Sequence, residues 1–262
     1  MGRLIRLYKT LLLIYCASVS AALAADAPTE QHFYGVYDFS WTGVGLGNVA
    51  LGIEETADGY HMHAQVHSKG IVNLFTRHTS NTEVTGTRKG NRYQPLRYES
   101  HYMTKKKPRH VKLAFDEKGV VTEEFNDPPE DRSDRPEVPH SLKDGAVDPL
   151  TALLLTQGGA AQFKGFDAKR LYEVKSQQGE NAVAHILGER RKAVSYVLSR
   201  KPLGGMTAKE QTEYNKGEPP LTFYFSDDAK HTPLGVHMPI YLGSVQGVLV
   251  KECNSWDECK LE

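Results

Sequence analysis

The sequence predicts a mainly β protein, an antiparallel curved sheet or half-open β-barrel of about a dozen strands with one short apolar helix as a plug. Three observations support this fold class. Stretches of alternating apolar and polar residues recur along the chain, turn-forming residues separate them, and one segment, residues 148–157, has the composition of a buried helix. Residues 25–262 are therefore expected to form a single domain.

Residues 1–24 have the features of a secretory signal peptide. A basic start is followed by an apolar stretch and by the small-residue cleavage site Ala22-Leu23-Ala24. The apolar stretch is well short of the roughly 18 to 20 residues that a membrane anchor needs. We expect cleavage after Ala24 and a location in the periplasm of a Gram-negative bacterium or outside the cell.

The charge balance excludes a generally basic nucleic-acid surface. The chain carries 32 basic and 32 acidic residues, and residues 1–24 contain three basic residues and no acidic one, which leaves a net charge of −3 on the remainder. The glycine-rich stretch at residues 43–47 has strand-like sequence on both sides, so a turn or bulge is expected there rather than a dinucleotide-binding loop. We expect no nucleic-acid partner, no cofactor and a monomer.

The first half of the domain is predicted to be a meander of strands. Residues 32–41 place aromatic side chains, Phe39 and Trp41 among them, on one face at a period of two. A second strand is centred on residues 49–53. Turns rich in glycine, proline and asparagine separate the further strands expected at residues 60–67, 74–85, 92–104, 111–116 and 120–125.

The strand at residues 60–67 contains a His-x-His pattern. His61 and His63 lie on the same face of that strand, at a spacing suited to a metal ion. No third ligand stands out beside them in the sequence, so an outward polar face is the favoured interpretation. No metal site is predicted, and His61 and His63 stay weak candidates.

A proline- and charge-rich stretch, residues 126–140, interrupts the strands. It contains four prolines and almost no apolar residues, which predicts a mobile surface loop. The helix follows, with Asp148 as N-cap, Pro149 as its first residue and Gly158-Gly159 after its end. It is expected to be buried on most of its surface, because apolar side chains surround it: Leu150, Ala152, Leu153, Leu154 and Leu155.

The second half of the domain returns to strands, expected at residues 169–175, 183–189, 194–200, 221–226, 233–242 and 245–250. Residues 202–216 form a loop with one polar helical turn. At the end of the chain, Cys253 and Cys259 are expected to form a disulfide that staples the tail and stabilises the fold by roughly 2 kcal/mol at most. Their spacing fits neither a redox motif nor the usual zinc-knuckle motif.

Three stretches of the chain carry a family pattern. They are the segment from Tyr37 to Gly47, the helix start from Asp148 to Leu153, and the hairpin from Phe225 to Leu234. Together they resemble the exported bacterial family known as domain of unknown function 3108, over roughly residues 32–251. The resemblance implies an exported, barrel-like β protein without an assigned reaction. Its architecture is similar to that of periplasmic lipoprotein carriers of the LolA type, which hold acyl chains inside an incomplete barrel.

The expected barrel has an aromatic and leucine lining that forms either a closed core or a cleft for a lipid or acyl chain. Its members are Phe39, Trp41, Leu150, Leu153, Leu154, Phe223 and Phe225. The leading hypothesis is a non-enzymatic periplasmic protein of the cell envelope that binds a lipophilic ligand or acts as an envelope-maintenance scaffold.

Two alternatives stay open. The first is an interaction module for other envelope proteins, which would use exposed edge strands or the proline-rich loop. The second, less favoured, is a metal-dependent hydrolase built on the strand of His61 and His63. The chain has no legible catalytic motif, so an enzyme is the less favoured class.

Overall fold

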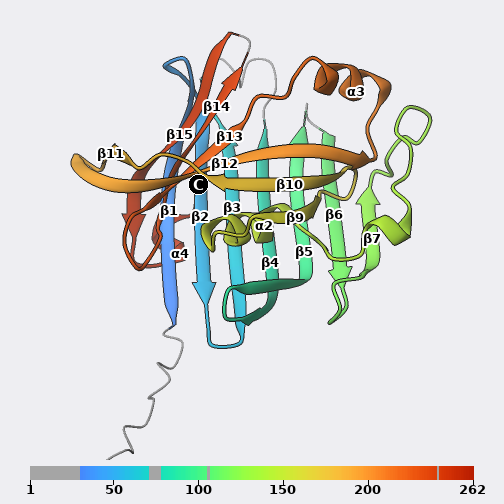
Figure 1. Cartoon of the computed structure of the whole chain (residues 1–262), viewed down its shortest axis with the longest axis horizontal. Coiled ribbons are helices and arrows are strands. Elements are labelled where there is room, and N and C mark those ends of the chain that lie inside the picture. Colours follow the sequence, from blue (N-terminus) through green and yellow to red (C-terminus); the bar gives the residue numbers. More distant parts are fainter. Residues whose placement is uncertain (1–29, 71–77, 105–106, 241) are drawn as a thin grey trace, which may run out of the picture.

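A computed structural model describes residues 30–70, 78–104, 107–240 and 242–262 (Figure 1). Its strands form one sheet in the order β7-β6-β5-β4-β3-β2-β1-β15-β14-β13-β12-β10-β9-β8, with β11 paired to β12. The sheet bends into a nearly closed barrel, which confirms the predicted fold class. Among the described residues, no helix has the length and apolar composition needed to cross a membrane. The predicted signal peptide lies outside these residues.

The first half of the chain forms an antiparallel meander, as predicted. Its strands are β1 (Gln31–Trp41), β2 (Val44–Glu55), β3 (Gly59–Ser68), β4 (Thr79–Lys89), β5 (Arg92–Thr104), β6 (Lys107–Phe115) and β7 (Val121–Asp127). Alternation sets the faces, since Tyr60 and Met62 of β3 are buried while His61 and His63 lie on the opposite, outer face. Residues 74–77 of the strand expected at 74–85 lie outside the described residues.

The glycine-rich stretch after β1 contains a bulge, as expected. The register of β1 against β2 shifts between Phe39 and Ser40, opposite Gly47 and Gly45. A side chain at Gly47 would place its Cβ 2.4 Å from the backbone oxygen of His67 on β3. Only glycine therefore allows β2 and β3 to approach this closely at the point where the sheet bends.

The second half contains two strands that the sequence did not indicate, β8 and β9. Its strands are β8 (Ala146–Val147), β9 (Gln162–Phe166), β10 (Leu171–Gln178), β11 (Ala182–Ile186), β12 (Glu189–Gly204), β13 (Leu221–Ser226), β14 (Pro233–Ile240) and β15 (Gly243–Cys253). A short 3-10 turn, η1 (His140–Leu142), precedes β8. The expected polar helical turn is α3 (Ala208–Asn215), which Thr207 and Glu210 begin with a reciprocal capping box.

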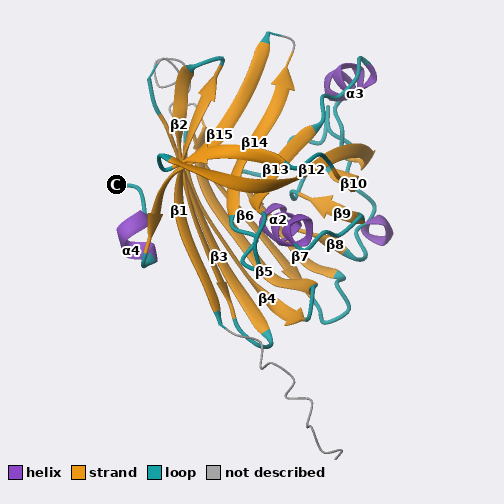
Figure 2. Cartoon of the chain, turned by 60° about the vertical axis from the view of Figure 1, so that its left-hand side comes forward, coloured by secondary structure: helices purple, strands orange, loops and turns teal. Residues whose placement is uncertain are grey.

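The apolar helix, α2 (Pro149–Gln157), lies inside the curved sheet (Figure 2). It contacts β5 on one side and β9 on the other. The side chain of Asp148 accepts hydrogen bonds from the backbone N–H groups of Leu150 and Thr151, at 2.9 and 3.0 Å. Leu154 is 1 % exposed, and Gly159 takes the left-handed conformation after the helix. The predicted cap and helix are confirmed, and Leu154 is buried as expected, whereas Leu150, Ala152, Leu153 and Leu155 are half-buried.

The C-terminal tail folds over the outer face of β1–β3. The predicted disulfide between Cys253 and Cys259 is present, with Cα atoms 5.8 Å apart, and encloses α4 (Trp256–Cys259). The indole of Trp256 rests on β2, where a Cβ added to Gly52 would lie 3.1 Å from the indole Cε3. The disulfide therefore holds an aromatic side chain against the outside of the sheet.

The proline-rich segment that follows β7 is fastened to the rest of the fold by ion pairs. The Arg135 guanidinium, 11 % exposed, lies 3.1 Å from Glu130 and 2.8 Å from Glu210 of α3. Lys169 Nζ is 2.7 Å from Glu130. The segment is mostly exposed, as expected of a surface loop, but Val138 is 2 % exposed and packs into the core.

The pair between Arg135 and Glu210 predicts an acid-dependent loss of stability. The hydrogen bond from Arg135 is the main cause that lowers the pKa of Glu210 to about 2, from 4.5. A depressed folded-state pKa contributes stability that is present above the unfolded pKa and is lost as pH falls through the folded pKa. Arg135→Gln should lower the free energy of unfolding by about 2 kcal/mol at pH 7.

Urea unfolding of the wild type and of Arg135→Gln checks this expectation. The difference between the two proteins should shrink as pH falls from 7 to 2.5. Lys216→Gln is the matched control, because Lys216 pairs with Glu213 on the same helix but both side chains are exposed, and it should change stability little. A difference between wild type and Arg135→Gln that stays constant with pH would contradict the role of Glu210.

Candidate functional site

An apolar cavity of about 160 Å³ lies between α2 and the inner face of the sheet. Among the residues that line this cavity, Tyr37 alone has a polar side-chain atom. Its hydroxyl donates to the carbonyl of Pro233 at 2.7 Å. The cavity therefore has no unpaired polar group to hold water. The lining residues are Tyr37, Phe39, Val49, Leu51, Ala64, Leu150, Leu153, Phe223, Pro233, Gly235 and Val236.

A second cavity, of about 300 Å³, lies on the other side of Leu153 and Phe223, which line both cavities. Phe163, Phe166 and Leu198 are among its apolar residues. Its charged residues already have partners within the protein. Asp167 accepts from Arg170 at 2.7 Å, and Arg200 pairs with Glu218. The space available to a ligand there is consequently mostly apolar.

Four of the seven residues expected in a barrel lining come together at the first cavity: Phe39, Leu150, Leu153 and Phe223. The other three do not line it. Leu154 and Phe225 are 1 % and 0 % exposed and pack in the core. Trp41 is 39 % exposed, and its indole Nε1 donates to the carbonyl of Leu242 at 2.7 Å.

Two of these differences follow from the position of each residue along its strand. Trp41 is the last residue of β1, where its side chain is exposed. Phe225 stacks on Phe223 with the ring centroids 6.3 Å apart, so both lie on one face of β13, but Phe225 is fully buried in the core. The register shifts near both residues leave out Leu46 on β2 and Leu234 on β14, so alternation along β1 and β13 is kept. Leu154 differs because it faces the core side of α2.

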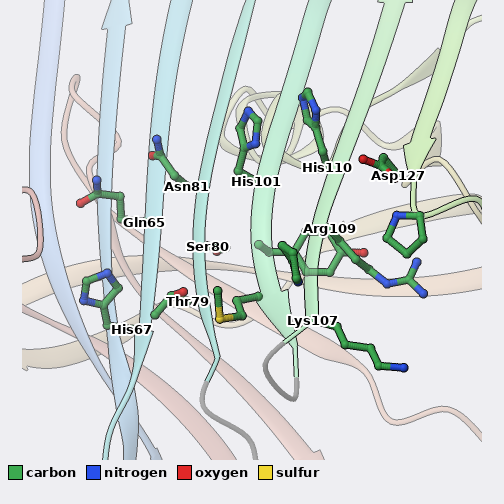
Figure 3. Close-up of a pocket in the computed structure, with 14 residues that line it drawn as sticks. Gln65, His67, Thr79, Ser80, Asn81, His101, Lys107, Arg109, His110 and Asp127 are labelled. Carbon is green, nitrogen blue, oxygen red and sulfur yellow. The ribbon is translucent and has the colours of Figure 1, made fainter.

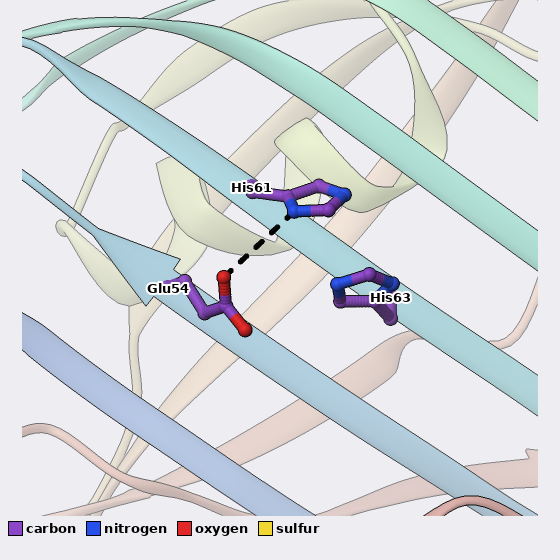
Figure 4. Close-up of side chains that lie close together, drawn as sticks. All are labelled: Glu54, His61 and His63. Carbon is purple, nitrogen blue, oxygen red and sulfur yellow. Dashed lines mark ion pairs between the residues drawn. The ribbon is translucent and has the colours of Figure 1, made fainter. Parts of the chain in front are cut away.

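A second candidate site lies on the outer face of the sheet. Glu54 on β2 pairs with His61 on β3, and His63 follows two residues later on the same face (Figure 4). The carboxylate oxygen of Glu54 is 3.8 Å from His61 Nδ1, and the two imidazole centroids are 3.9 Å apart. Burial, and next the neighbouring His61, lower the pKa of His63. Trp256 of α4 stacks on His63 with the ring centroids 5.0 Å apart.

A similar trio lies across the same face on β5 and β6. Glu99 accepts from His110 at 2.7 Å and lies 3.2 Å from His101, while Lys112 and Arg97 also pair with this carboxylate, at 3.5 and 3.3 Å. Burial raises the pKa of Glu99, but the hydrogen bond from His110 and the nearby cations outweigh it and bring that pKa to about 2.

This trio borders an open depression of about 670 Å³ on β3–β7 (Figure 3). Polar side chains at paired positions on neighbouring strands form one row there, across β3 to β7: Gln65, Asn81, His101, His110 and Asp127. The depression is shallow and its histidines are tied to Glu99, so we assign no ligand to it.

The sequence analysis missed the carboxylates of both trios. A signal for the first existed, because a four-residue turn at residues 56–59 places Glu55 opposite Tyr60 and therefore Glu54 opposite His61. The partner Trp256 lies almost 200 residues further along the chain, and strand alternation gives no indication of its position. The second trio joins β5 to β6 across residues 105–106, which are outside the described residues.

The fold and its inner cavities define a barrel-like β protein. The model of the family described as "Protein of unknown function (DUF3108)" matches residues 34–250, and the chain belongs to that family. The chain is also similar to a solved structure, a beta-barrel-like protein of domain of unknown function DUF1849 from Brucella abortus. The TM-score is 0.51 at 12 % sequence identity, over 86 % of this chain and 98 % of that one. The comparison with curated proteins found no match.

Proposed function

We propose that this is a non-enzymatic, exported protein of the cell envelope that binds a lipophilic ligand, an acyl chain, beside α2. The observation that carries the proposal is the pair of apolar cavities that share Leu153 and Phe223. The signal-like residues 1–24 support an exported location.

The size and chemistry of the cavities favour such a ligand. A dry apolar cavity of about 150 Å³ is large enough to bind benzene, and ligand pockets begin at about 300 Å³. The cavity of about 160 Å³ reaches the benzene-binding size, and the cavity of about 300 Å³ reaches the lower end of the range for ligand pockets. A rotamer change of Leu153 or Phe223 would join them into one channel. A narrow, flexible and apolar molecule fits such a channel, and a polar substrate does not.

The direct test is native mass spectrometry, with organic extraction, of the protein purified gently from its natural compartment. We expect a co-purifying lipid or acyl chain. Once the lipid has been extracted, the protein should bind a fluorescent fatty-acid probe. An empty protein that binds no probe after delipidation would overturn the proposal.

Filling the wall between the cavities should weaken probe binding. Leu153→Trp is expected to raise the Kd of the fatty-acid probe at least tenfold, because the larger ring occupies space in both cavities, while extra core volume costs about 1–3 kcal/mol of stability. Leu155→Trp is the matched control, since Leu155 lies on the same helix and lines neither cavity. Equal probe affinity in both variants would argue against binding at Leu153.

A further inference from the structure

We propose that Glu54, His61 and His63 form a binding site for a divalent transition-metal ion of the Zn²⁺ class on the outer face of β2 and β3. The site is independent of the inner cavities. It uses the His-x-His pattern of β3 and completes it with a carboxylate that the hairpin brings from β2.

The donor set and its spacing match a zinc site with an open position. One ligand atom from each of the three side chains lies within 4.8 Å of the other two. Tetrahedral ligands about 2.0–2.2 Å from Zn²⁺ are themselves roughly 3.4 Å apart, so small side-chain rotations suffice to bring these donors together. Two imidazoles and one carboxylate are a donor set that binds Zn²⁺ and leaves a fourth position for water.

Side chains that would orient these ligands are also in place. Tyr34 donates its hydroxyl to Glu54 Oε1 at 2.8 Å, while Glu54 Oε2 is the oxygen next to His61. Glu83 on β4 lies 3.7 Å from His63 Nδ1 and adds a second carboxylate beside the trio. Such outer partners fix the orientation of metal ligands and raise their basicity. Trp256, held by the Cys253–Cys259 disulfide, covers His63 from the solvent side.

This site differs from the trio on β5 and β6 in the charged side chains that surround its carboxylates. Within the part of the chain that the structure describes, Glu54 and Glu83 form ion pairs with histidines and with no lysine or arginine. Glu99 instead pairs with Lys112 and Arg97. Two fixed cations neutralise that carboxylate and repel a metal ion, so the trio of Glu99 should not bind one.

Isothermal titration of the purified protein with Zn²⁺ tests the site. We expect one equivalent to bind, and the variant with both His61→Ala and His63→Ala should bind at least tenfold more weakly. Glu54→Gln, which keeps the size of the side chain, should weaken binding to a similar degree. The matched control is His101→Ala with His110→Ala, which removes the same residue types from the other trio and should leave the Kd within twofold.

Trp256 supplies a readout that reports where the metal sits. The chain has two tryptophans, Trp41 and Trp256. In a Trp41→Phe background, the paramagnetic ion Co²⁺ should quench the remaining fluorescence, because Trp256 stacks on His63 at 5.0 Å. In a Trp256→Phe background the fluorescence of Trp41 should not change. Circular dichroism establishes that each variant is folded.

The proposal is overturned if the wild type binds no Zn²⁺, or if the His101 and His110 variant loses binding while the His61 and His63 variant keeps it. Quenching of Trp41 with no effect on Trp256 would also overturn it. None of these results bears on the inner cavities, because the fatty-acid probe measures those separately.

Discussion

Replacing Leu154 by alanine is expected to lower the free energy of unfolding by about 3 kcal/mol. Leu154 is 1 % exposed and belongs to the core cluster that α2 shares with the sheet. Truncation removes the burial of several methyl and methylene groups and leaves a cavity that rigid strands on both sides cannot close. Urea denaturation followed by circular dichroism measures the change.

Two further substitutions sharpen this prediction. Leu154→Met keeps the volume and should cost less than about 1.5 kcal/mol. Leu154→Asp places an unpaired carboxylate at a site that water does not reach, and we expect no folded protein. A folded Leu154→Asp variant that only loses probe binding would show that Leu154 lines a ligand channel instead of the core.

Replacing Asp148 by alanine is expected to lower the free energy of unfolding by about 3 kcal/mol. The substitution removes the helix cap and leaves buried N–H groups without an acceptor. Asp148 is 0 % exposed and accepts from the backbone N–H groups of Leu150 and Thr151. Thr151 also bonds Tyr60 of β3 at 2.7 Å, so the cap connects α2 to the sheet. Asp148→Asn keeps an acceptor oxygen and should therefore lose less stability than Asp148→Ala.

The same residue predicts a pH effect opposite in sign to that of Glu210. Burial raises the pKa of Asp148 above its usual 3.8. The folded protein then holds this proton more tightly than the unfolded chain does, so stability falls as pH rises from about 3.8 through the folded-state pKa. Asp148→Asn imitates the neutral acid, so its deficit in stability relative to the wild type should shrink as pH rises from 4 to 7. A constant difference across that range would contradict a raised pKa.

Local patterns predicted most of the elements, because those elements carry their own signals. β5 has the predicted bounds, residues 92–104, and α2 begins and ends at the expected cap residues. β9 was missed because three of the five residues of Gln162–Phe166 are polar or glycine, and its pairing partners are β8 and β10 in the folded sheet. β12 begins at Glu189, five residues before the predicted start at residue 194, because its first residues, Glu189 to Lys192, are charged and resemble a turn.

The candidate sites were predictable only in part. Four lining residues follow from alternation and helix periodicity, whereas the exposure of Trp41 and the full burial of Phe225 depend on where each lies in the folded sheet. In the proposed metal site, the position of Glu54 follows from the register of the hairpin between β2 and β3. The position of Trp256 beside His63 follows only from the folded C-terminal tail. Contacts between distant segments, and bulges within strands, are what local spacing cannot report.

The first and last strands of the barrel are neighbours in the middle of the sheet. β1 pairs with β15, so that Trp41 lies opposite Val245, and each half of the chain builds outward from this seam. A nascent chain can form the β1–β7 meander early but has no partner for the open side of β1 until residues 243–253 have been synthesised. The closing step joins segments some 200 residues apart, and such non-local pairing is slow. Completion of the sheet is therefore a late event in the folding of the chain, and the edge of β1 stays unpaired until its last strand is present.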